Sequence, residues 1–184
     1  VTLVIAADGD MGLNFPDYRA TERTFQLLMQ VAGRAGRGDK PGQVLIQTRD
    51  PEHFCWEFVR SGDYQGFFEK EILFREKRRY PPFVKLGLIR MSFPADWDQG
   101  PEKGPAILAE MAKRGREAAK PLGAMFLGPA PAPLAMIGGR KRFHCLLKGQ
   151  DWPSLRALYA QVTRKLPAKS KFRASLDLDP VDML

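Results

Sequence analysis

The sequence predicts an α/β protein built in two parts, and three observations carry this prediction. Strand-like apolar runs alternate with helical repeats along the 184 residues. The segment Tyr80-Pro81-Pro82 interrupts a long helical pattern, because proline cannot continue a helix. The charge also divides there: residues 1–80 carry 12 Lys and Arg against 12 Asp and Glu, whereas residues 81–184 carry 17 against 9. We therefore expect a neutral first part and a basic second part.

The first part has the order strand, loop, helix, strand, which is α/β in kind but too short to close a sheet alone. Its first apolar run is typical of a buried strand, and the following Gly, Asp, Asn and Pro residues predict a loop. Phe25, Leu28, Met29 and Ala32 then repeat at helical spacing, before glycines end the helix. The expected elements are a buried strand at 1–7, a loop at 8–17, a helix at about 21–32 and a strand at 43–48.

Two further helices are expected before the second part, at about residues 51–60 and 64–79. The second of them carries charges of both signs, a pattern typical of a solvated helix face. We therefore divide the chain into residues 1–50, a helical connector at 51–82, and a C-terminal domain at 83–184.

The C-terminal domain has the order β-α-β-β-α-β, which is the ferredoxin-like arrangement of an antiparallel sheet with two helices on one face. Apolar and polar residues alternate strictly in its last strand, as expected for a half-buried strand. Three prolines in residues 128–134 predict a rigid linker or loop. The expected strands are 84–93, 125–127, 142–147 and 172–178, and the expected helices are 101–120 and 152–166.

Composition excludes several classes of protein. A hydrophobic fraction of 44% is enough for a core, and no apolar run is long enough to predict a membrane span. Cys55 and Cys145 lie far apart, and neither has a second Cys or a His at metal-ligand spacing, so we expect two buried thiols in a reducing compartment and no metal site. The first residues form an apolar run without an initiating Met, which favours a fragment that begins within a strand.

The formal net charge of +8 favours a polyanionic partner, nucleic acid first. A basic surface that only keeps the protein soluble is the alternative. The segment Gly138-Gly139-Arg140-Lys141-Arg142-Phe143 combines flexible backbone, three cations and an aromatic ring. These groups suit backbone phosphates and a stacked base, respectively. The structural alternative is a solvated basic hairpin with Phe143 in the core.

A second motif, Gln30-Val-Ala-Gly33-Arg34-Ala-Gly-Arg37, places two arginines three residues apart at the end of a helix. Arginine suits phosphate because its planar guanidinium donates in a fixed fork and keeps its charge. The motif therefore predicts a nucleoside triphosphate site. The sequence contains no Gly-x-x-x-x-Gly-Lys-Ser/Thr loop, so the matching phosphate cradle is missing from it. A salt-bridged helix end is the alternative.

Residues 8–37, DGDMGLNFPDYRATERTFQLLMQVAGRAGR, closely resemble the PriA family of bacterial primosomal helicases. They resemble helicase motif V running into motif VI of the second RecA-like lobe. The Gln-x-x-Gly-Arg-x-x-Arg pattern alone would indicate only a superfamily 2 helicase, and the segments downstream, in this order, indicate PriA. Those segments are GQVLIQT at 42–48, DPEH at 50–53, YPPF at 80–83, GPAPA at 128–132, GGR at 138–140 and LDLDP at 176–180.

The resemblance implies a two-lobe, ATP-dependent 3′-to-5′ DNA helicase that recognises stalled replication forks and restarts replication by primosome assembly in the bacterial cytoplasm, at the nucleoid. This chain would be part of the second RecA-like lobe followed by the C-terminal domain. ATP, Mg²⁺ and Zn²⁺ would belong to the full-length protein, with the phosphate loop and the zinc ligands upstream. The implied partners are forked and single-stranded DNA, the C-terminal tail of single-strand-binding protein and other primosome proteins, with no membrane.

By resemblance, Arg34 and Arg37 are arginine fingers that stabilise charge on the transferring γ-phosphoryl group. Gln30 would position water or phosphate, and Gly33 would let the backbone approach closely. Asp10 is the candidate that couples the nucleotide site to the DNA track, with a structural loop carboxylate as the alternative.

Arg140 is the candidate partner for the carboxylate of the single-strand-binding protein tail. His144 stands where a polar residue such as Gln is expected in relatives. We therefore expect a fragment that binds DNA without hydrolysing ATP. A stand-alone nucleic-acid- or protein-binding module without a helicase role is the alternative.

Overall fold

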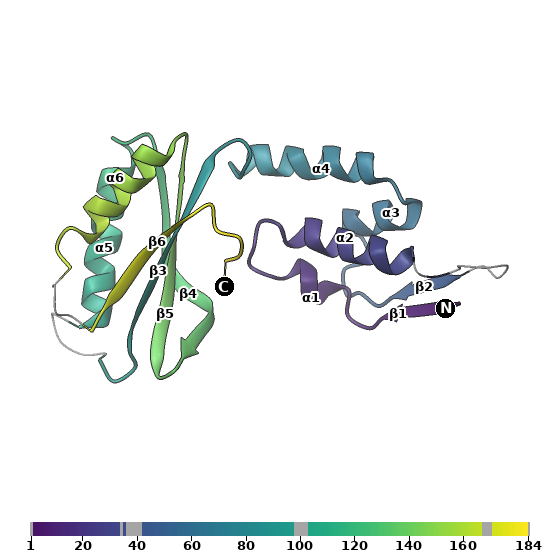
Figure 1. Cartoon of the computed structure of the whole chain (residues 1–184), viewed down its shortest axis with the longest axis horizontal. Coiled ribbons are helices and arrows are strands. Elements are labelled where there is room, and N and C mark those ends of the chain that lie inside the picture. The colour runs from purple at the N-terminus through teal and green to yellow at the C-terminus, as the bar shows by residue number, and fades with distance from the viewer. Residues whose placement is uncertain (1, 34, 36–41, 98–102, 167–170, 184) are drawn as a thin grey trace. The chain divides into compact units, whose positions relative to one another are not determined.

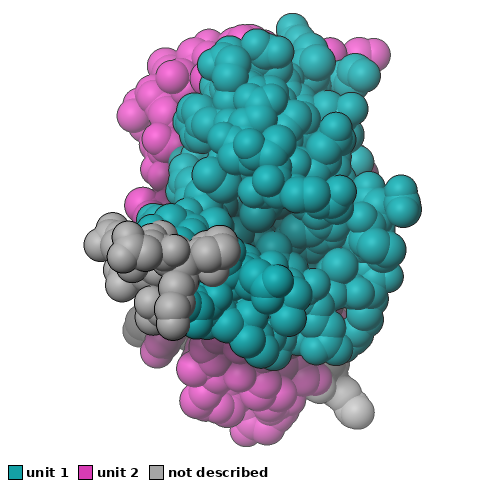
Figure 2. All heavy atoms as spheres, turned by 90° about the vertical axis from the view of Figure 1, so that its right-hand side faces the viewer, with its two compact units in different colours: residues 1–78 teal, residues 79–184 magenta. Residues whose placement is uncertain are grey.

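The computed structural model describes residues 2–33, 35, 42–97, 103–166 and 171–183. The chain divides into two compact units, Val1–Arg78 (unit 1) and Arg79–Leu184 (unit 2), which Figure 2 colours separately. Each unit has its own hydrophobic core. Among the helices that the structure describes, none combines the length and the apolar character that a bilayer crossing needs.

In the part of unit 1 that the structure describes, two short parallel strands pack with four helices (Figure 1). Its core gathers around Phe25, Trp56 and Phe67, and the rings of Phe25 and Phe67 stack at a centroid distance of 4.0 Å. The elements are β1 (Leu3–Ala6), α1 (Asp10–Leu13), α2 (Ala20–Ala32), β2 (Gln43–Ile46), α3 (Phe54–Ser61) and α4 (Tyr64–Lys77).

The first strand differs from the prediction of a buried strand. Alternate side chains of β1 and β2 are exposed, with Leu3, Ile5 and Leu45 at 45%, 61% and 54%. Parallel strands are normally covered on both faces, whereas this two-stranded sheet leaves one apolar face uncovered within the described residues. The predicted loop at 8–17 also contains a helical turn, α1, because the Asp8 carboxylate accepts the N–H groups of Asp10 and Met11.

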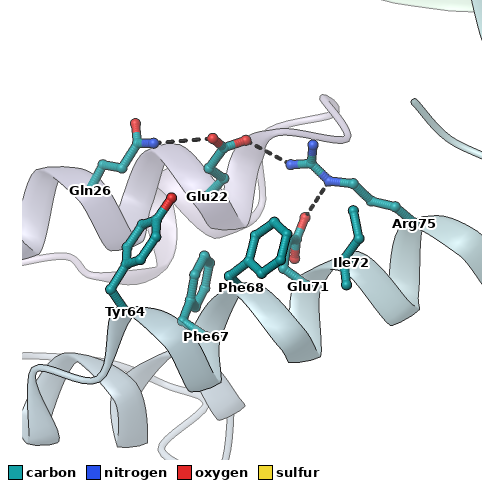
Figure 3. Close-up of a pocket in the computed structure, with 8 residues that line it drawn as sticks. All are labelled: Glu22, Gln26, Tyr64, Phe67, Phe68, Glu71, Ile72 and Arg75. Carbon is teal, nitrogen blue, oxygen red and sulfur yellow. Dashed lines mark hydrogen bonds and ion pairs between the residues drawn. The ribbon is translucent and has the colours of Figure 1, made fainter. Parts of the chain in front are cut away.

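A small pocket of about 120 Å³ lies between α2 and α4 (Figure 3). At one end of it, the Arg75 guanidinium contacts Glu22 at 2.7 Å and Glu71 at 3.0 Å. Arg75 and Glu71 both lie on α4, whereas Glu22 lies on α2, so the ion pair between Arg75 and Glu22 links the two helices. The lining residues are Glu22, Gln26, Tyr64, Phe67, Phe68, Glu71, Ile72 and Arg75.

Unit 2 has the predicted order β-α-β-β-α-β. Its four strands form one antiparallel sheet in the order β4-β5-β3-β6, and α5 and α6 lie together on one face of it (Figure 1). Ile89, Leu147 and Leu158 are fully buried in the core between the sheet and these helices. The elements are β3 (Lys85–Pro94), α5 (Gly104–Ala119), β4 (Met125–Ile137), β5 (Arg140–Gly149), α6 (Trp152–Thr163) and β6 (Arg173–Leu178).

The prediction of a linker or loop at 128–134 is wrong, because those residues belong to β4. β4 is an edge strand, and proline is tolerated at an edge because one side of the strand needs no ladder hydrogen bonds. The pairing with β5 shifts register between Leu127 and Ala130 and between Pro131 and Met136. Regular pairing with β5 is interrupted at these two shifts, so the prolines fit within β4 and the strand continues to Ile137.

The face of the sheet opposite α5 and α6 is called the open face here. Side chains alternate along a strand, so Ile89 and Met91 of β3 face the helices while Arg90 and Ser92 face the other side. Cross-strand partners share a face, which places further residues of β5 and β6 beside them. The open face thus includes Arg90, Ser92, Arg140, Arg142, His144, Arg173, Ser175 and Asp177.

Both cysteines are free and buried, as predicted. Burial raises the pKa of the Cys55 thiol and of the Cys145 thiol to about 12, so both thiols are protonated at neutral pH.

Candidate functional site

Gln30 and Gly33, two of the residues predicted to meet a nucleotide, lie at the C-terminal end of α2. Gln30 is exposed in its last turn, and Gly33 caps the helix by donating its backbone N–H to the Met29 carbonyl at 3.0 Å. Arg34 and Arg37 lie outside the described residues. The role of this helix end toward a nucleotide therefore stays a prediction.

Asp10 lies where the two parallel strands of unit 1 end. Its carboxylate accepts the Thr48 hydroxyl at 2.5 Å and the Arg49 backbone N–H at 2.6 Å, so it ties α1 to the residues after β2. These two hydrogen bonds, the Thr48 bond first, hold the pKa of Asp10 below its usual value. In this structure both carboxylate oxygens are engaged within unit 1, and a coupling role for Asp10 stays a prediction.

Replacing Asp10 with asparagine should destabilise unit 1 at neutral pH, because an amide offers one acceptor where two N–H or O–H donors converge. The folded pKa of Asp10 lies below 3.8, so its stabilising effect is complete above the unfolded value and is lost as pH falls through the folded one. The difference between wild type and Asp10→Asn should therefore shrink in acid. Hydrogen exchange of unit 1 at several pH values measures it, with exposed Asp50→Asn as the control. A pH-independent difference would contradict this account.

The basic hairpin in unit 2 is built by β4, β5 and a two-residue turn. Ile137 pairs with Arg140 across Gly138 and Gly139, whose φ angles are +54° and +70°. Positive φ at both central positions is the type I′ geometry, which matches the twist of a hairpin and favours glycine. The turn therefore places Arg140 at the first position of β5, next to the tip of the hairpin.

Alanine at Gly138 or Gly139 should lower the free energy of unfolding of unit 2 by about 1 kcal/mol each. An added Cβ would meet no atom within 4 Å at either position, so the cost is conformational rather than steric. Asparagine, which tolerates the left-handed region, should cost less at the same positions. Urea unfolding followed by circular dichroism compares the two substitutions, and equal losses for alanine and asparagine would count against a type I′ turn.

Arg140 is anchored within the sheet rather than extended into solvent. Its Nε donates to the Ser92 hydroxyl at 3.1 Å, and its Nη2 donates to the carbonyls of Ser92 at 2.9 Å and Lys171 at 2.7 Å. Partial burial, and then the charge of nearby Arg173, lower the pKa of Arg140. These three hydrogen bonds use the Nε and Nη2 donors and leave the Nη1 side of the fork to face a ligand.

The structure separates the four predicted residues of the hairpin onto two faces. Arg140 and Arg142 lie on the open face, whereas Lys141 and Phe143 alternate with them toward the helix side. The Phe143 ring stacks on buried Phe93 at 5.6 Å and packs against the core. Phe143 is engaged in packing, and base stacking on it stays a prediction, as does phosphate contact at Arg140 and Arg142.

Two further residues that join Arg140 and Arg142 on the open face, Ser92 and Arg173, were not predicted from the sequence. Arg142 of β5, Ser92 of β3 and Arg173 of β6 are direct cross-strand neighbours in one row of the open face. In the described part of the chain, no carboxylate lies within ion-pair distance of Arg140, Arg142 or Arg173. In the sequence, Arg173 is one of the polar residues that alternate with apolar residues in the last strand. Only the order of the strands in the sheet brings it close to Arg142.

His144 lies on the open face in the row next to Arg142, and it pairs directly with Arg90 across the strands. Burial lowers its pKa to about 4, and the charges of Arg90 and Arg142 contribute, so the imidazole is neutral at neutral pH. Its Nε2 is buried and has no hydrogen-bond partner among the described residues. His144 therefore adds no charge to the face.

No group of three or more His, Cys, Asp or Glu side chains within the described ranges is arranged to hold a metal ion. A hollow of about 500 Å³ lies beside the end of α2 in unit 1, and its walls are mainly apolar. It is lined by Ala32, Val44, Ile46, Thr48, Pro51, Trp56, Val59 and Arg60.

Comparison with protein families matches residues 76–181 to the primosomal protein N C-terminal domain. The whole chain is similar to replication restart protein PriA of Bacillus subtilis, with 35% identity over 188 residues. It is 38% identical to replication restart protein PriA of Synechocystis over 184 residues, and 38% identical to that of Treponema pallidum over 182. These alignments cover 100%, 100% and 99% of this chain but only 22%, 21% and 27% of those proteins. The chain thus spans about a quarter or less of its relatives' length.

Proposed function

Because the chain belongs to the PriA family of replication restart proteins, we propose that it is the C-terminal region of an ATP-dependent 3′-to-5′ DNA helicase that restarts stalled replication forks by primosome assembly. Within this region, unit 2 binds DNA through its open face. The observation that carries the DNA-binding proposal is the group of cations on β5 and β6, the two strands that flank β3. In it, Arg140, Arg142 and Arg173 face the same side without a carboxylate partner among the described residues.

Residues 1–50 are, in this proposal, the C-terminal part of the second RecA-like lobe, and 51–82 are a helical connector. The parallel pairing of β1 and β2 supports it, as does the position of Asp10 and Thr48 after the carboxyl ends of those strands. Ligands of open parallel sheets bind at that edge. The exposed apolar side chains of Leu3, Ile5 and Leu45 fit a sheet that more of the lobe would cover.

The nucleotide site is completed by the first lobe in the full-length protein, which supplies the phosphate loop and the Mg²⁺ ligands. Arg34 and Arg37 then stabilise the charge on the γ-phosphoryl oxygens, and Gln30 positions water or phosphate. Zn²⁺ belongs to the upstream part of the full-length protein. The protein acts in the bacterial cytoplasm, at the nucleoid.

Residues 83–184 form a ferredoxin-like domain, supported by the sheet order β4-β5-β3-β6 with both helices on one face. Arginine forks suit both phosphates and carboxylates. The same face therefore offers Arg140 to the acidic tail of single-strand-binding protein, beside forked or single-stranded DNA. Other primosome proteins are further partners of the full-length helicase.

Fluorescence anisotropy with a labelled forked duplex and a single-stranded oligonucleotide tests the proposal on this chain. We expect binding at low salt and no DNA-stimulated ATP hydrolysis, because the phosphate cradle is not in the sequence. Failure to bind either DNA would remove the DNA-binding role. Stimulated hydrolysis would contradict an incomplete nucleotide site.

A stand-alone nucleic-acid- or protein-binding module is the second candidate, favoured by the separate core of unit 2. The two candidates differ in the gene product that cells make. A protein that spans only this chain would support the module, whereas a protein of the relatives' length would support the helicase.

A further inference from the structure

The segment that follows β6, residues 179–183, returns across the open face of the sheet. Figure 1 shows the C-terminal end of the chain on the side of the sheet away from α5 and α6. The Asp179 N–H donates to the Leu86 carbonyl of β3 at 2.9 Å, and Pro180 is fully buried. Leu86 and Leu88 face away from the helices and are nevertheless 0% exposed. Part of the open face is therefore covered by the chain itself.

Arg90 of β3 is held by acidic residues at this place. Its guanidinium forms an ion pair with the Asp177 carboxylate, and its Nη2 lies 3.7 Å from the Asp182 Oδ1. The same nitrogen donates to the Asp182 carbonyl at 3.1 Å. Asp177 comes from β6 itself, whereas Asp182 comes from the returning segment. The segment thus supplies a second anion to an arginine already paired within the sheet.

Arg90 also borders the cation row described above. It lies directly opposite His144 and Ser175, one row along from Arg142, Ser92 and Arg173. Side chains on adjacent rows of one face are within reach of a single phosphate backbone. The difference between Arg90 and its neighbours is that Arg142 and Arg173 have no carboxylate partner among the described residues, whereas Arg90 has two.

We propose that Arg90 is a further phosphate-binding residue of the open face and that Asp182 in the C-terminal segment withholds it until DNA displaces the segment. This inference rests on the proposed function, because it requires DNA on that face. Carboxylate and phosphate compete for the same guanidinium fork. Asp182 is about half exposed, at 48% of its side chain, so its carboxylate can turn into solvent, whereas displacing the whole segment also exposes the buried Pro180.

Asp182→Asn removes one of the two carboxylates that pair with Arg90 and should tighten binding of a labelled forked duplex. One additional phosphate contact corresponds to up to about eightfold in affinity at about 0.1 M salt, with a salt slope steeper by about one. Glu110→Gln is the matched control. Glu110 pairs with Arg114 at 3.1 Å on α5, so the variant makes the same charge change and releases an arginine on the other layer of the unit. We expect less than about a twofold effect from it.

The Arg90→Gln variant tests whether the gain in DNA affinity from Asp182→Asn depends on Arg90. In the Arg90→Gln background, Asp182→Asn should no longer tighten binding, which a double-mutant cycle measures as coupling. Equal effects of Asp182→Asn and Glu110→Gln, or an Asp182→Asn gain that persists without Arg90, would overturn the inference while leaving DNA binding by unit 2 in place. Absence of DNA binding in wild type and variants alike would overturn both.

Hydrogen exchange of the wild-type chain gives a readout that depends on no substitution. If DNA displaces the segment, the Asp179 amide, which donates to Leu86, should exchange faster in the complex. Unchanged or slower exchange at residues 179–183 with DNA bound would show that the segment stays in place, and the inference would fail.

Discussion

Replacing Arg37 with alanine in the full-length protein should reduce ATP hydrolysis about a thousandfold or more and leave DNA affinity nearly unchanged. The expectation follows from the role of an arginine finger, whose charge meets the transferring phosphoryl group mainly in the transition state. DNA affinity should persist because the proposed DNA contacts lie in unit 2, on Arg140, Arg142 and Arg173.

Lys70→Ala is the matched control for Arg37→Ala. Lys70 is an exposed cation of α4 in the same unit, so its removal makes the same change in net charge. Steady-state hydrolysis with saturating forked DNA compares the two variants. Hydrolysis by Arg37→Ala at the level of Lys70→Ala would remove Arg37 from the finger role.

Arg142→Gln combined with Arg173→Gln should weaken DNA binding by roughly 60-fold at about 0.1 M salt, if each arginine neutralises one phosphate. Both side chains lie in one row of the open face, on either side of Ser92. Neither has a carboxylate partner within the described ranges, so the substitutions leave no buried acid unpaired and should preserve the fold. Anisotropy titration measures the loss, and circular dichroism checks the fold.

The control pair is Lys113→Gln with Arg116→Gln, two exposed cations of α5. This variant has the same net charge as the open-face variant but changes the helix layer. It should bind DNA within about threefold of wild type, since only distant, screened charge is lost. Equal losses in the two double variants would place the DNA elsewhere than on the open face.

The order of elements in unit 2 could be predicted because its strands and helices have different hydrophobic periods. The strict alternation in β6 is one example, and the helical stripe of Leu155, Leu158 and Val162 is another, since all three are fully buried. The length of β4 could not be predicted, because prolines normally end a strand. They are accommodated here only because β4 lies at the edge of the sheet, which is a property of the sheet order.

The candidate DNA site was predictable only in part for a related reason. Arg140 and Arg142 stand out in the sequence as neighbours of a glycine turn. Arg173 is 31 residues further along than Arg142, and it joins the row only through pairing of β3 with both β5 and β6. The contiguous run of four residues also suggested one surface, whereas alternation along β5 sends Lys141 and Phe143 to the other side.

The burial of β1 was mispredicted from composition alone. An apolar run predicts burial only if other elements cover both of its faces, and a two-stranded sheet cannot supply them. The exposed side chains of Leu3 and Ile5 therefore reflect which neighbours β1 has within the described residues.

The most direct test of DNA binding by the open face is the salt dependence of wild-type affinity for a forked duplex. Three arginines that each neutralise one phosphate predict a slope of about −2.7 in a plot of log K against log salt concentration. The Arg142→Gln, Arg173→Gln variant should retain a slope of about −0.9. A wild-type slope near zero, or the same slope for wild type and variant, would contradict the account.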